Sequence, residues 1–164
     1  MPQTTGGGQE KNLRSGTYNA PAILGLGEAV QEMAKRSADI ARMREIKAYL
    51  WSLLETLDGV RVNGPLPIEE DSAPHILSVS FDGVRGEVMR NALEGAGILI
   101  STGSACASHK QKVSATLKAM GLTGEQADGT VRISLGLYNT MEEMKETAAQ
   151  MEKVFTMLRR YRRR

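Results

Sequence analysis

The segment His75-Ile76-Leu77-Ser78-Val79-Ser80-Phe81 alternates large apolar residues with small polar ones, which is the period of a half-buried β-strand. Asp82-Gly83 follows it, and this pair favours a turn. The segment Thr130-Val131-Arg132-Ile133-Ser134-Leu135 repeats the alternation later in the chain. Two such strands separated by helical patterns predict a small α+β fold, with a short mixed or antiparallel sheet covered by helices on one face.

The elements next to the first strand extend this layout. Upstream, Val60-Arg61-Val62 alternates and stops at Asn63-Gly64-Pro65, which predicts a short strand that runs into a turn. Downstream, the pattern from Glu87 to Leu93 predicts a helix that ends at Gly95. Ile98-Leu99-Ile100 then predicts a short apolar strand that leads into the next loop.

Helical spacing of apolar residues marks the two ends of the chain. From Ile23 to Leu57 the spacing predicts one long helix or two adjoining ones that end near Gly59. Val113 to Met120 predicts a short helix, with Gly121 as its end. The last helix starts at a capping box, Thr140 to Glu143. Its apolar face follows a helical period: Met144, Ala148, Met151, Phe155 and Leu158.

The composition is that of a single globular domain able to bury a core: 164 residues, 41% hydrophobic and 24% charged. The formal net charge of +2 is too small to indicate a nucleic-acid or membrane partner across the whole surface. Positive charge gathers at residues 159–164, which are interpreted as a solvated basic tail or, alternatively, a docking strip for RNA or an acidic partner.

Cellular location and thiol chemistry follow from what the sequence contains. It has no apolar run of membrane-helix length and no signal-peptide pattern at its start, so we expect a cytoplasmic protein. A single cysteine cannot form an intrachain disulfide. His75 and His109 are the only histidines, so no metal site is predicted and a thiol role remains. His75, on an apolar strand, is interpreted as a structural histidine.

The segment 101–110 contains no apolar residue larger than alanine and directly follows a predicted strand, which indicates an exposed or active-site loop. A lone cysteine is most often a buried small apolar residue. For Cys106 the polar setting favours function instead, because His109, Lys110 and Lys112 lie close in sequence and favour the reactive thiolate. We therefore predict that Cys106 is a nucleophilic thiol.

This loop resembles the active-cysteine loop of the NifS/IscS-type cysteine desulfurases, pyridoxal-phosphate enzymes of the class V aminotransferase family with the aspartate aminotransferase fold. Further segments resemble that family in the same order along the chain: Gly6-Gly7-Gly8-Gln9-Glu10, Leu13-Arg14-Ser15-Gly16-Thr17, Pro74 to Ser78, Arg85-Gly86-Glu87, Ala119 to Leu122, and Val131 to Gly136. The ordered set spans essentially the whole sequence and is far more specific than any single segment.

The resemblance implies a domain layout. Residues 21–164 correspond to the small C-terminal domain of the pyridoxal-phosphate-dependent transferase fold (fold type I), and residues 1–20 to a Gly-rich lead-in at the edge of the large domain. The active-cysteine loop is expected at 101–112 and the basic tail at 159–164. Packing on a large domain also implies that the helix around Ile23 to Val30 is apolar and exposed in isolation, where it should self-associate or be disordered.

The resemblance also implies roles for three residues. Cys106 matches the cysteine that attacks the sulfur of cofactor-bound L-cysteine, so that L-alanine leaves and a protein persulfide remains. Arg132 matches the arginine that binds the substrate carboxylate, and Thr17 a threonine that reaches the cofactor phosphate of the other subunit. Without the resemblance, Arg132 is a surface charge on a strand, Thr17 a turn residue or helix cap, and Gly6 to Gly8 a flexible linker.

The family's cofactor lysine, its ring-stacking histidine and the aspartate at the ring nitrogen belong to the preceding half of the enzyme. Nothing before Gly6 supplies them, so we expect this portion to be inactive alone and to need the missing N-terminal domain. The complete enzyme is expected to use pyridoxal phosphate and L-cysteine, to pair with a homodimer mate, and to pass sulfur to an acceptor or scaffold protein for Fe–S cluster assembly or tRNA thiolation.

Two other functions stay open at this point. The chain can act as a free-standing sulfur-carrier or redox-thiol protein, in which Cys106 receives persulfide from another enzyme. It can also be an interaction module that binds through its helical face or its basic tail, although direct nucleic-acid binding is not favoured by the small net charge.

Overall fold

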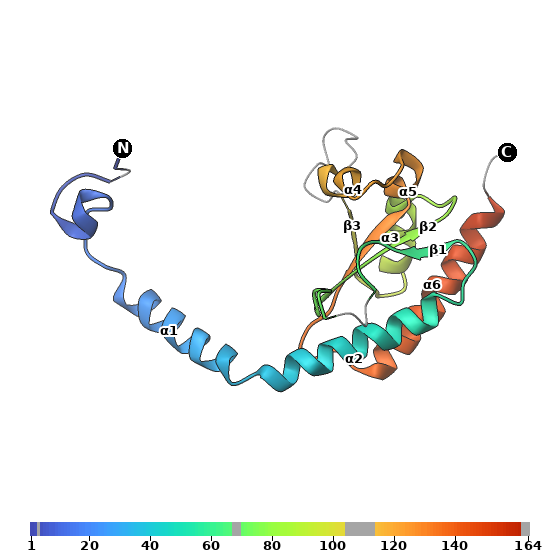
Figure 1. Cartoon of the computed structure of the whole chain (residues 1–164), viewed down its shortest axis with the longest axis horizontal. Coiled ribbons are helices and arrows are strands. Elements are labelled where there is room, and N and C mark those ends of the chain that lie inside the picture. The colour runs from blue at the N-terminus through green and yellow to red at the C-terminus, as the bar shows by residue number, and fades with distance from the viewer. Residues whose placement is uncertain (3, 67–69, 104–113, 162–164) are drawn as a thin grey trace. The chain divides into compact units, whose positions relative to one another are not determined.

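The computed structural model describes residues 1–2, 4–66, 70–103 and 114–161 (Figure 1). They form two compact units, Met1–Ser37 and Ala38–Arg164. The first unit holds a short polar turn, η1 (Gln9–Asn12), and the helix α1 (Ala20–Ala34). The second unit holds the sheet and the helices that pack on it.

The described sheet has four strands in the order β1-β2-β4-β3, and every neighbouring pair is antiparallel. The strands are β1 (Val60–Val62), β2 (Ile76–Phe81), β3 (Ser101–Thr102) and β4 (Thr130–Ser134). The two longest, β2 and β4, are the two alternating segments of the sequence, and they lie side by side at the centre. The prediction of a short sheet in an α+β fold is confirmed, with the antiparallel alternative the correct one.

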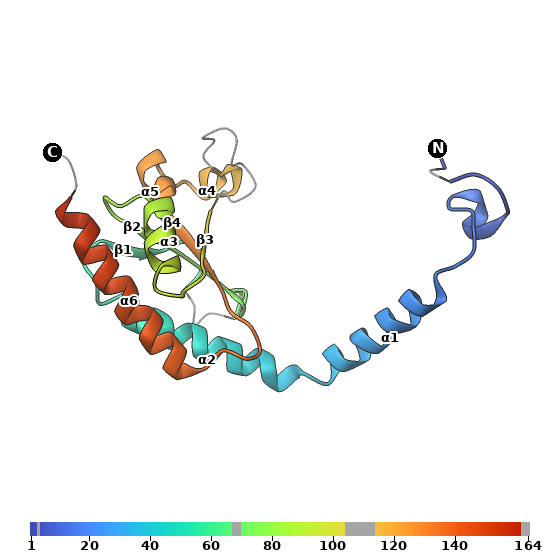
Figure 2. The same ribbon diagram turned by 180° about the vertical axis from the view of Figure 1, so that it is seen from behind.

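The core lies on one face of this sheet. Strand β2 directs Leu77, Val79 and Phe81 to that face, and β4 directs Val131 and Ile133 there. Three helices complete the core with their apolar sides: α2 (Ser37–Leu54), α3 (Gly86–Glu94) and α6 (Met141–Arg160). Figures 1 and 2 show α2 and α6 side by side along the sheet. The helices therefore cover one face, as the alternation predicts.

Helix α6 confirms the strongest helical pattern of the sequence. Its capping box is formed: the Glu143 amide donates to Thr140 Oγ1 (3.2 Å), and the Thr140 amide donates to Glu143 Oε2 (3.0 Å). The hydrogen bonds to Asn139 and Thr140 lower the pKa of the Glu143 carboxyl, because they stabilise its ionised form. The start of the helix is thus fixed by its own local sequence.

The first residues of the basic segment 159–164 belong to helix α6 and not to a solvated tail. Arg159 belongs to α6, and its guanidinium carbon lies 5.2 Å from the centre of the Phe155 ring. The same guanidinium pairs with Asp58 (3.2 Å) and donates to its carbonyl (2.8 Å). Arg159 therefore ties α6 to the turn before β1, and the tail proper can begin only after Arg160.

Phe155 is the residue of α6 whose truncation should cost the most stability. It is buried and meets Phe81 edge-on, with ring centres 5.1 Å apart. Phe155→Ala should lower the free energy of unfolding by about 3–5 kcal/mol, through lost apolar burial and the cavity left behind. Urea unfolding measures this. Met157→Ala on the same helix, at an exposed position, is the control and should change the free energy by less than about 0.5 kcal/mol.

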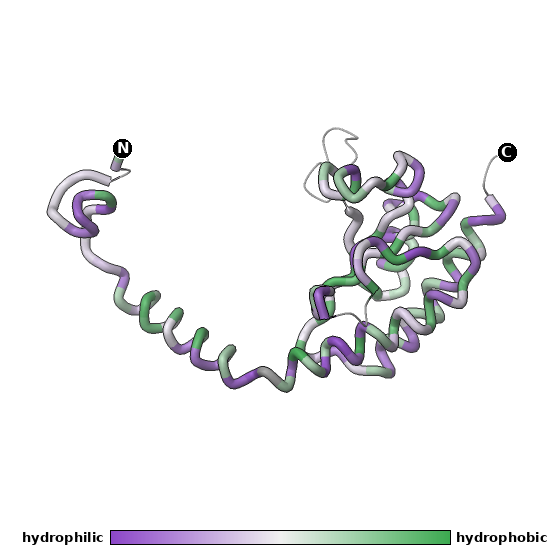
Figure 3. The backbone as a smooth tube through the Cα atoms, viewed as in Figure 1, coloured by the Kyte–Doolittle hydropathy of each residue, from purple (hydrophilic) through white to green (hydrophobic). Residues whose placement is uncertain are grey.

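The early helical segment forms two adjoining helices, the second of the two predicted alternatives. Helix α1 ends at Ala34 and α2 begins at Ser37. None of the residues of α1 is buried, and its large apolar side chains are exposed: Ile23, Leu24, Leu26, Val30 and Met33. Figure 3 shows this hydrophobic character along the helix. The exposed apolar surface expected around Ile23 to Val30 is present, on an ordered helix; self-association stays a prediction.

Two sequence predictions near the sheet are wrong in detail. Ile98-Leu99-Ile100 is not a strand, because the Ile98 amide bonds back to the Leu93 carbonyl (3.0 Å) at the end of α3; the paired residues are Ser101–Thr102 instead. Leu99 is 81% exposed, and only its two neighbours pack on the core. His75 lies just before β2 and is exposed, so it is not a buried structural histidine.

Two short helices follow the cysteine loop. Helix α4 (Ala115–Ala119) matches the predicted short helix and ends before Gly121, whose φ of 82° suits glycine. Val113, the expected start, lies outside the described residues. Helix α5 (Gly124–Asp128) was not predicted. Among the described residues no helix is both long and apolar enough to cross a membrane.

Candidate functional site

Arg132 lies on β4, on the sheet face opposite the one that α2, α3 and α6 cover. Its neighbours Val131 and Ile133 are buried in the core, and the strand period directs Arg132 to the opposite face, where it is exposed. In the register of the sheet, Arg132 is opposite Ser78 of β2 on one side and Ser101 of β3 on the other. Directly opposed residues have Cβ atoms about 4.5–5.5 Å apart on the same face. Two serine side chains therefore flank the arginine.

The Arg132 guanidinium is uncommitted within the described part of the chain, where it has neither a hydrogen bond nor an ion pair. Only its backbone is engaged, since Ser101 Oγ donates to the Arg132 carbonyl (3.2 Å). A guanidinium presents a planar fork of N–H donors that matches a carboxylate. Arg132 is thus arranged to bind an anionic group that arrives from outside these residues.

A network of small polar side chains stiffens the same face. Asn63, just after β1, donates from Nδ2 to Ser78 Oγ (3.2 Å) and Ser80 Oγ (2.9 Å). Ser80 and Thr130 hydroxyls are 2.8 Å apart, and Thr130 Oγ1 donates to the Gln126 carbonyl (2.8 Å) in α5. The network therefore links β1, β2, β4 and α5 beneath Arg132. Ser80 and Thr130 are buried, so these bonds also satisfy groups that water cannot reach.

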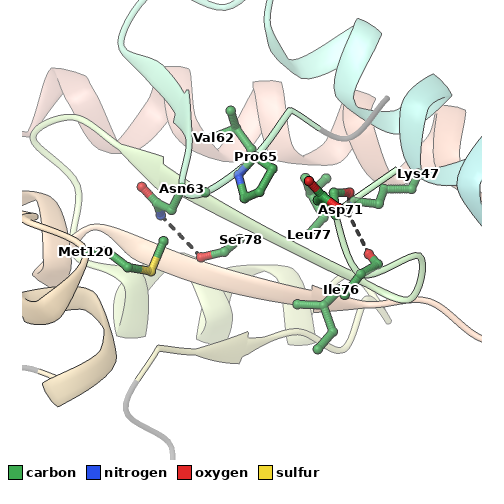
Figure 4. A pocket seen from close by; sticks show the side chains of 12 residues that line it. Lys47, Val62, Asn63, Pro65, Asp71, Ile76, Leu77, Ser78 and Met120 are labelled. Atoms are coloured by element: carbon green, nitrogen blue, oxygen red, sulfur yellow. Dashed lines mark hydrogen bonds between the residues drawn. The ribbon is translucent and has the colours of Figure 1, made fainter. Parts of the chain in front are cut away.

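Beside this network is a small cavity of about 180 Å³ (Figure 4). Asn63 and Ser78 line it with their hydrogen-bonded side chains, and Met120 and Ile76 contribute apolar surface. The remaining lining residues are Lys47, Val62, Gly64, Pro65, Asp71, Ser72, Ala73 and Leu77. Within the described residues there is no group of three His, Cys, Asp or Glu side chains that could hold a metal ion.

Lys47 of α2 is the one lysine of the described chain that is buried, at 3% exposure. Its Nζ donates to Ser72 Oγ and to the Ala73 carbonyl (2.7 Å), while Arg44 donates to the Ser72 carbonyl (3.0 Å) and the Glu70 carbonyl (2.8 Å). Burial lowers the pKa of Lys47, and the nearby charge of Arg44 lowers it further. The two cations fasten the segment before β2 onto α2.

This lowered pKa predicts how stability changes with pH. Between the pKa of folded Lys47 and its ordinary value of 10.5, the unfolded chain binds more protons than the folded one, so the free energy of unfolding should rise with pH. The contribution is at most about 1.4 kcal/mol per pH unit. Urea unfolding from neutral pH to pH 10.5 measures it. Lys47→Met should remove this rise, whereas Lys153→Met, at an exposed position of α6, should keep it.

Thr17 lies in the first unit, between η1 and α1, and its side chain is exposed. Its carbonyl accepts a hydrogen bond from Arg14 Nη1 (3.1 Å). Thr17 and Arg132 belong to different units, so their separation is not defined by the fold of either one. The helix-cap alternative for Thr17 is wrong, since Asn19 caps α1 through Oδ1, which accepts from the Ala22 amide (3.2 Å).

Cys106, His109, Lys110 and Lys112 lie outside the described residues. The positions on either side of that segment are described. A Cβ atom at Gly103 would lie 2.7 Å from Leu117 Cδ1, so the end of β3 packs directly against α4. Gly103 and Leu117, which are described residues on either side of that segment, therefore lie close together.

Sequence reasoning missed Ser78, Asn63 and Lys47 as parts of this region. Ser78 carried a usable signal. Like Arg132, it lies between two large apolar residues of an alternating strand, so the two residues point to the same face of the sheet when the strands pair. Lys47 carried none, since a lysine in a helix is usually solvated.

The family assignment rests on sequence comparison across most of the chain. Residues 2–146 match the model of the aminotransferase class-V family. The chain belongs to this family, which depends on pyridoxal phosphate. It is 39% identical to cysteine desulfurase IscS of Proteus mirabilis strain HI4320 over 96% of this chain and 38% of that protein. Klebsiella pneumoniae strain 342 IscS is 40% identical over 88% of this chain and 35% of its own length.

Solved structures agree with this assignment. A NifS-like protein superposes with a TM-score of 0.77 at 36% identity, covering 95% of this chain and 39% of that one. A NifS-like protein from Rickettsia africae ESF-5 has a TM-score of 0.76 at 24% identity, which shows the shared fold alone. The chain spans about 35–38% of the length of these two curated relatives. The fold prediction is confirmed, and it is the fold of pyridoxal-phosphate-dependent enzymes.

Two described side chains can bind anionic groups of the kind that such a cofactor carries. Arg132 offers an uncommitted guanidinium, and Thr17 an exposed hydroxyl. Lys47 does not fit the role of the cofactor lysine, since its Nζ is already hydrogen-bonded to Ser72 and Ala73.

Proposed function

We propose that this chain is the C-terminal part of a pyridoxal-phosphate-dependent cysteine desulfurase, a cytoplasmic enzyme that works as a homodimer. One structural observation carries the proposal: Arg132 is exposed, uncommitted and flanked by Ser78 and Ser101 on the sheet face opposite the one that α2, α3 and α6 cover. Cysteine desulfurases among the relatives support the reaction class.

Arg132 binds the carboxylate of L-cysteine in this proposal. Two parallel N–H···O bonds fix the amino acid in one orientation, so that its side-chain sulfur always approaches from the same direction. The rigid network below it, from Asn63 to Gln126, keeps β4 from shifting when the anion binds. Thr17 donates its hydroxyl to the cofactor phosphate of the partner subunit. When bound, the cofactor supplies an electron-withdrawing ring that weakens bonds at the substrate carbons.

Cys106 is the acceptor of sulfur. Its thiolate attacks the substrate sulfur, a S–S bond forms, and the bond between that sulfur and the substrate Cβ breaks. The electron pair of the broken bond stays with the carbon, which takes up a proton and leaves as L-alanine. His109, Lys110 and Lys112, close in sequence, favour the thiolate form. The persulfide then serves an acceptor protein in Fe–S cluster assembly or tRNA thiolation.

A direct test replaces the matching segment of Proteus mirabilis IscS with this chain, here called the chimera. With L-cysteine and pyridoxal phosphate, the chimera should release L-alanine and show the absorbance band of the bound cofactor. The isolated chain should show neither under the same conditions. A chimera that binds cofactor but releases no alanine contradicts the proposed reaction, and a strong cofactor band on the isolated chain contradicts its dependence on the N-terminal domain.

A further inference from the structure

The turn that carries Thr17 is built almost entirely from polar contacts. Ser15 is the one buried residue in the described part of residues 1–36, at 3% exposure. Its Oγ donates to the Gly7 carbonyl (2.8 Å), and its amide donates to the Thr4 carbonyl (3.3 Å). Residues 4–7 and 14–16 are therefore joined by hydrogen bonds, without an apolar core.

The Gln9 side chain links the two ends of this turn by a hydrogen bond. Its Oε1 accepts a hydrogen bond from the Gly16 amide (3.1 Å). The side chain also lies against Gly7, where a Cβ atom would be only 2.5 Å from Gln9 Oε1. Gly7 (φ 83°) and Gly16 (φ 107°) both have left-handed backbone that other residues rarely adopt. Gln9 thus lies against Gly7, where a side chain would collide with it, and is hydrogen-bonded to the Gly16 amide.

Three residues after Gln9 hold an unfavourable backbone conformation. Glu10, Lys11 and Asn12 have φ values of 51°, 52° and 65°. Each such residue costs roughly 1–3 kcal/mol and persists only where surrounding contacts enforce it. In this turn the enforcing contacts are the bonds of Ser15 and Gln9. The turn is consequently held in one shape at an energetic cost, which is typical of functional positions.

These bonds fix the backbone on both sides of Thr17 and leave its side chain exposed. Gln9 holds the Gly16 amide, and Arg14 Nη1 donates to the carbonyls of Gly16 (3.1 Å) and Thr17 (3.1 Å). The Thr17 hydroxyl has no partner among the described residues. A hydroxyl on a fixed backbone, open to solvent, is preorganised to donate to an external anion.

We propose that Gln9 is a positioning residue, which fixes Gly16 so that the Thr17 hydroxyl can bind an oxygen of a phosphate monoester. The inference rests on the proposed function, because it gives Thr17 the cofactor phosphate as its ligand. Gln9 itself does not touch the phosphate. It acts through the Gly16 amide and loses its effect if Thr17 has no role.

The first test uses the chain itself. Gln9→Met keeps the length of the side chain and removes the acceptor, so Gly16 amide hydrogen exchange measured by NMR should become about five- to tenfold faster. Gln31→Met is the matched control, because Gln31 is exposed on α1, and it should leave Gly16 unchanged. Gln9→Glu retains an acceptor oxygen and should keep Gly16 protected. Unchanged exchange in Gln9→Met overturns the inference.

The second test measures pyridoxal-phosphate dissociation from the chimera by dialysis. Thr17→Ala and Gln9→Met should each speed cofactor loss about tenfold, and the double variant should be no worse than Thr17→Ala alone. A residue with a merely structural role would add its own effect to that of Thr17→Ala. If Thr17→Ala weakens retention and Gln9→Met does not, the inference fails and the proposed function stands. If Thr17→Ala has no effect, the proposed role of Thr17 and the inference both fail.

Discussion

Arg132→Gln is expected to lower kcat/KM for L-cysteine in the chimera by roughly 30-fold to several thousandfold. The range corresponds to about 2–5 kcal/mol, the usual cost of removing one partner of a hydrogen-bonded charge pair. Glutamine removes the positive charge and the fork of donors that would face the substrate carboxylate. Steady-state alanine release as a function of L-cysteine concentration measures the effect, which should fall mainly on KM if the interaction is already complete in the bound substrate.

Two further variants separate carboxylate binding from a general effect of charge. Arg132→Lys keeps the charge and loses the planar fork, so its activity should lie between those of the wild type and Arg132→Gln. Arg61→Gln is the matched control, because Arg61 is also an exposed strand arginine but is paired with Asp82 at 2.6 Å. Surface pairs of this kind contribute about 0–1 kcal/mol, so Arg61→Gln should leave KM nearly unchanged. Equal effects of the two glutamine variants contradict the role of Arg132.

Much of the fold follows from local sequence patterns. Strand β2 and helix α6 were predicted nearly to the residue, because each has a clean period and a clear end: Asp82-Gly83 after the strand and the Thr140 capping box before the helix. These signals concern residues close together in the chain, and tertiary contacts only reinforce them.

Other elements depend on contacts between distant residues and left no clear sequence signal. Ile98-Leu99-Ile100 has the composition of a strand. The Ile98 amide is instead hydrogen-bonded to the Leu93 carbonyl at the end of α3, and pairing with β4 begins only at Ser101. Helix α5 spans only five residues, too few to display a helical period, although Thr123 and Gln126 form a capping box that a search for short helices could have found.

In the candidate site, too, some residues could be identified from the sequence and others only from the folded structure. The resemblance to a known family singled out Arg132 and Thr17, but neither the resemblance nor periodicity indicated which side chains support them. Ser78 required the register of β2 against β4, and Gln9 required a turn with three consecutive left-handed residues that no propensity predicts. Supporting residues are found only when the chain is folded, because their partners are distant in sequence or depend on an unusual backbone.

Cys106→Ser is expected to abolish persulfide formation on this chain completely. Cys106 is the only cysteine of the sequence, so any sulfur added to a thiol of this chain must be there. A serine hydroxyl at this position cannot hold an added sulfur atom, and its high pKa leaves almost none of it ionised at neutral pH. In the chimera the rest of the protein can contribute other thiols, so the mass of the intact protein does not locate the added sulfur. Mass spectrometry of the tryptic peptide that spans residues 91–110 and contains Cys106, after incubation with L-cysteine, shows whether the added sulfur is on this chain.

The same peptide measurement distinguishes an enzyme portion from a free-standing sulfur carrier. In the chimera, wild-type Cys106 should carry one added sulfur and L-alanine should appear, while Cys106→Ser should yield neither and still bind pyridoxal phosphate. The isolated chain, mixed with intact Proteus mirabilis IscS and L-cysteine, should gain little sulfur if Cys106 serves its own active site. Stoichiometric sulfur on the isolated chain would instead favour the carrier. Alanine release by the Cys106→Ser chimera at the wild-type rate would remove Cys106 from the reaction, because attack on the substrate sulfur needs a thiolate.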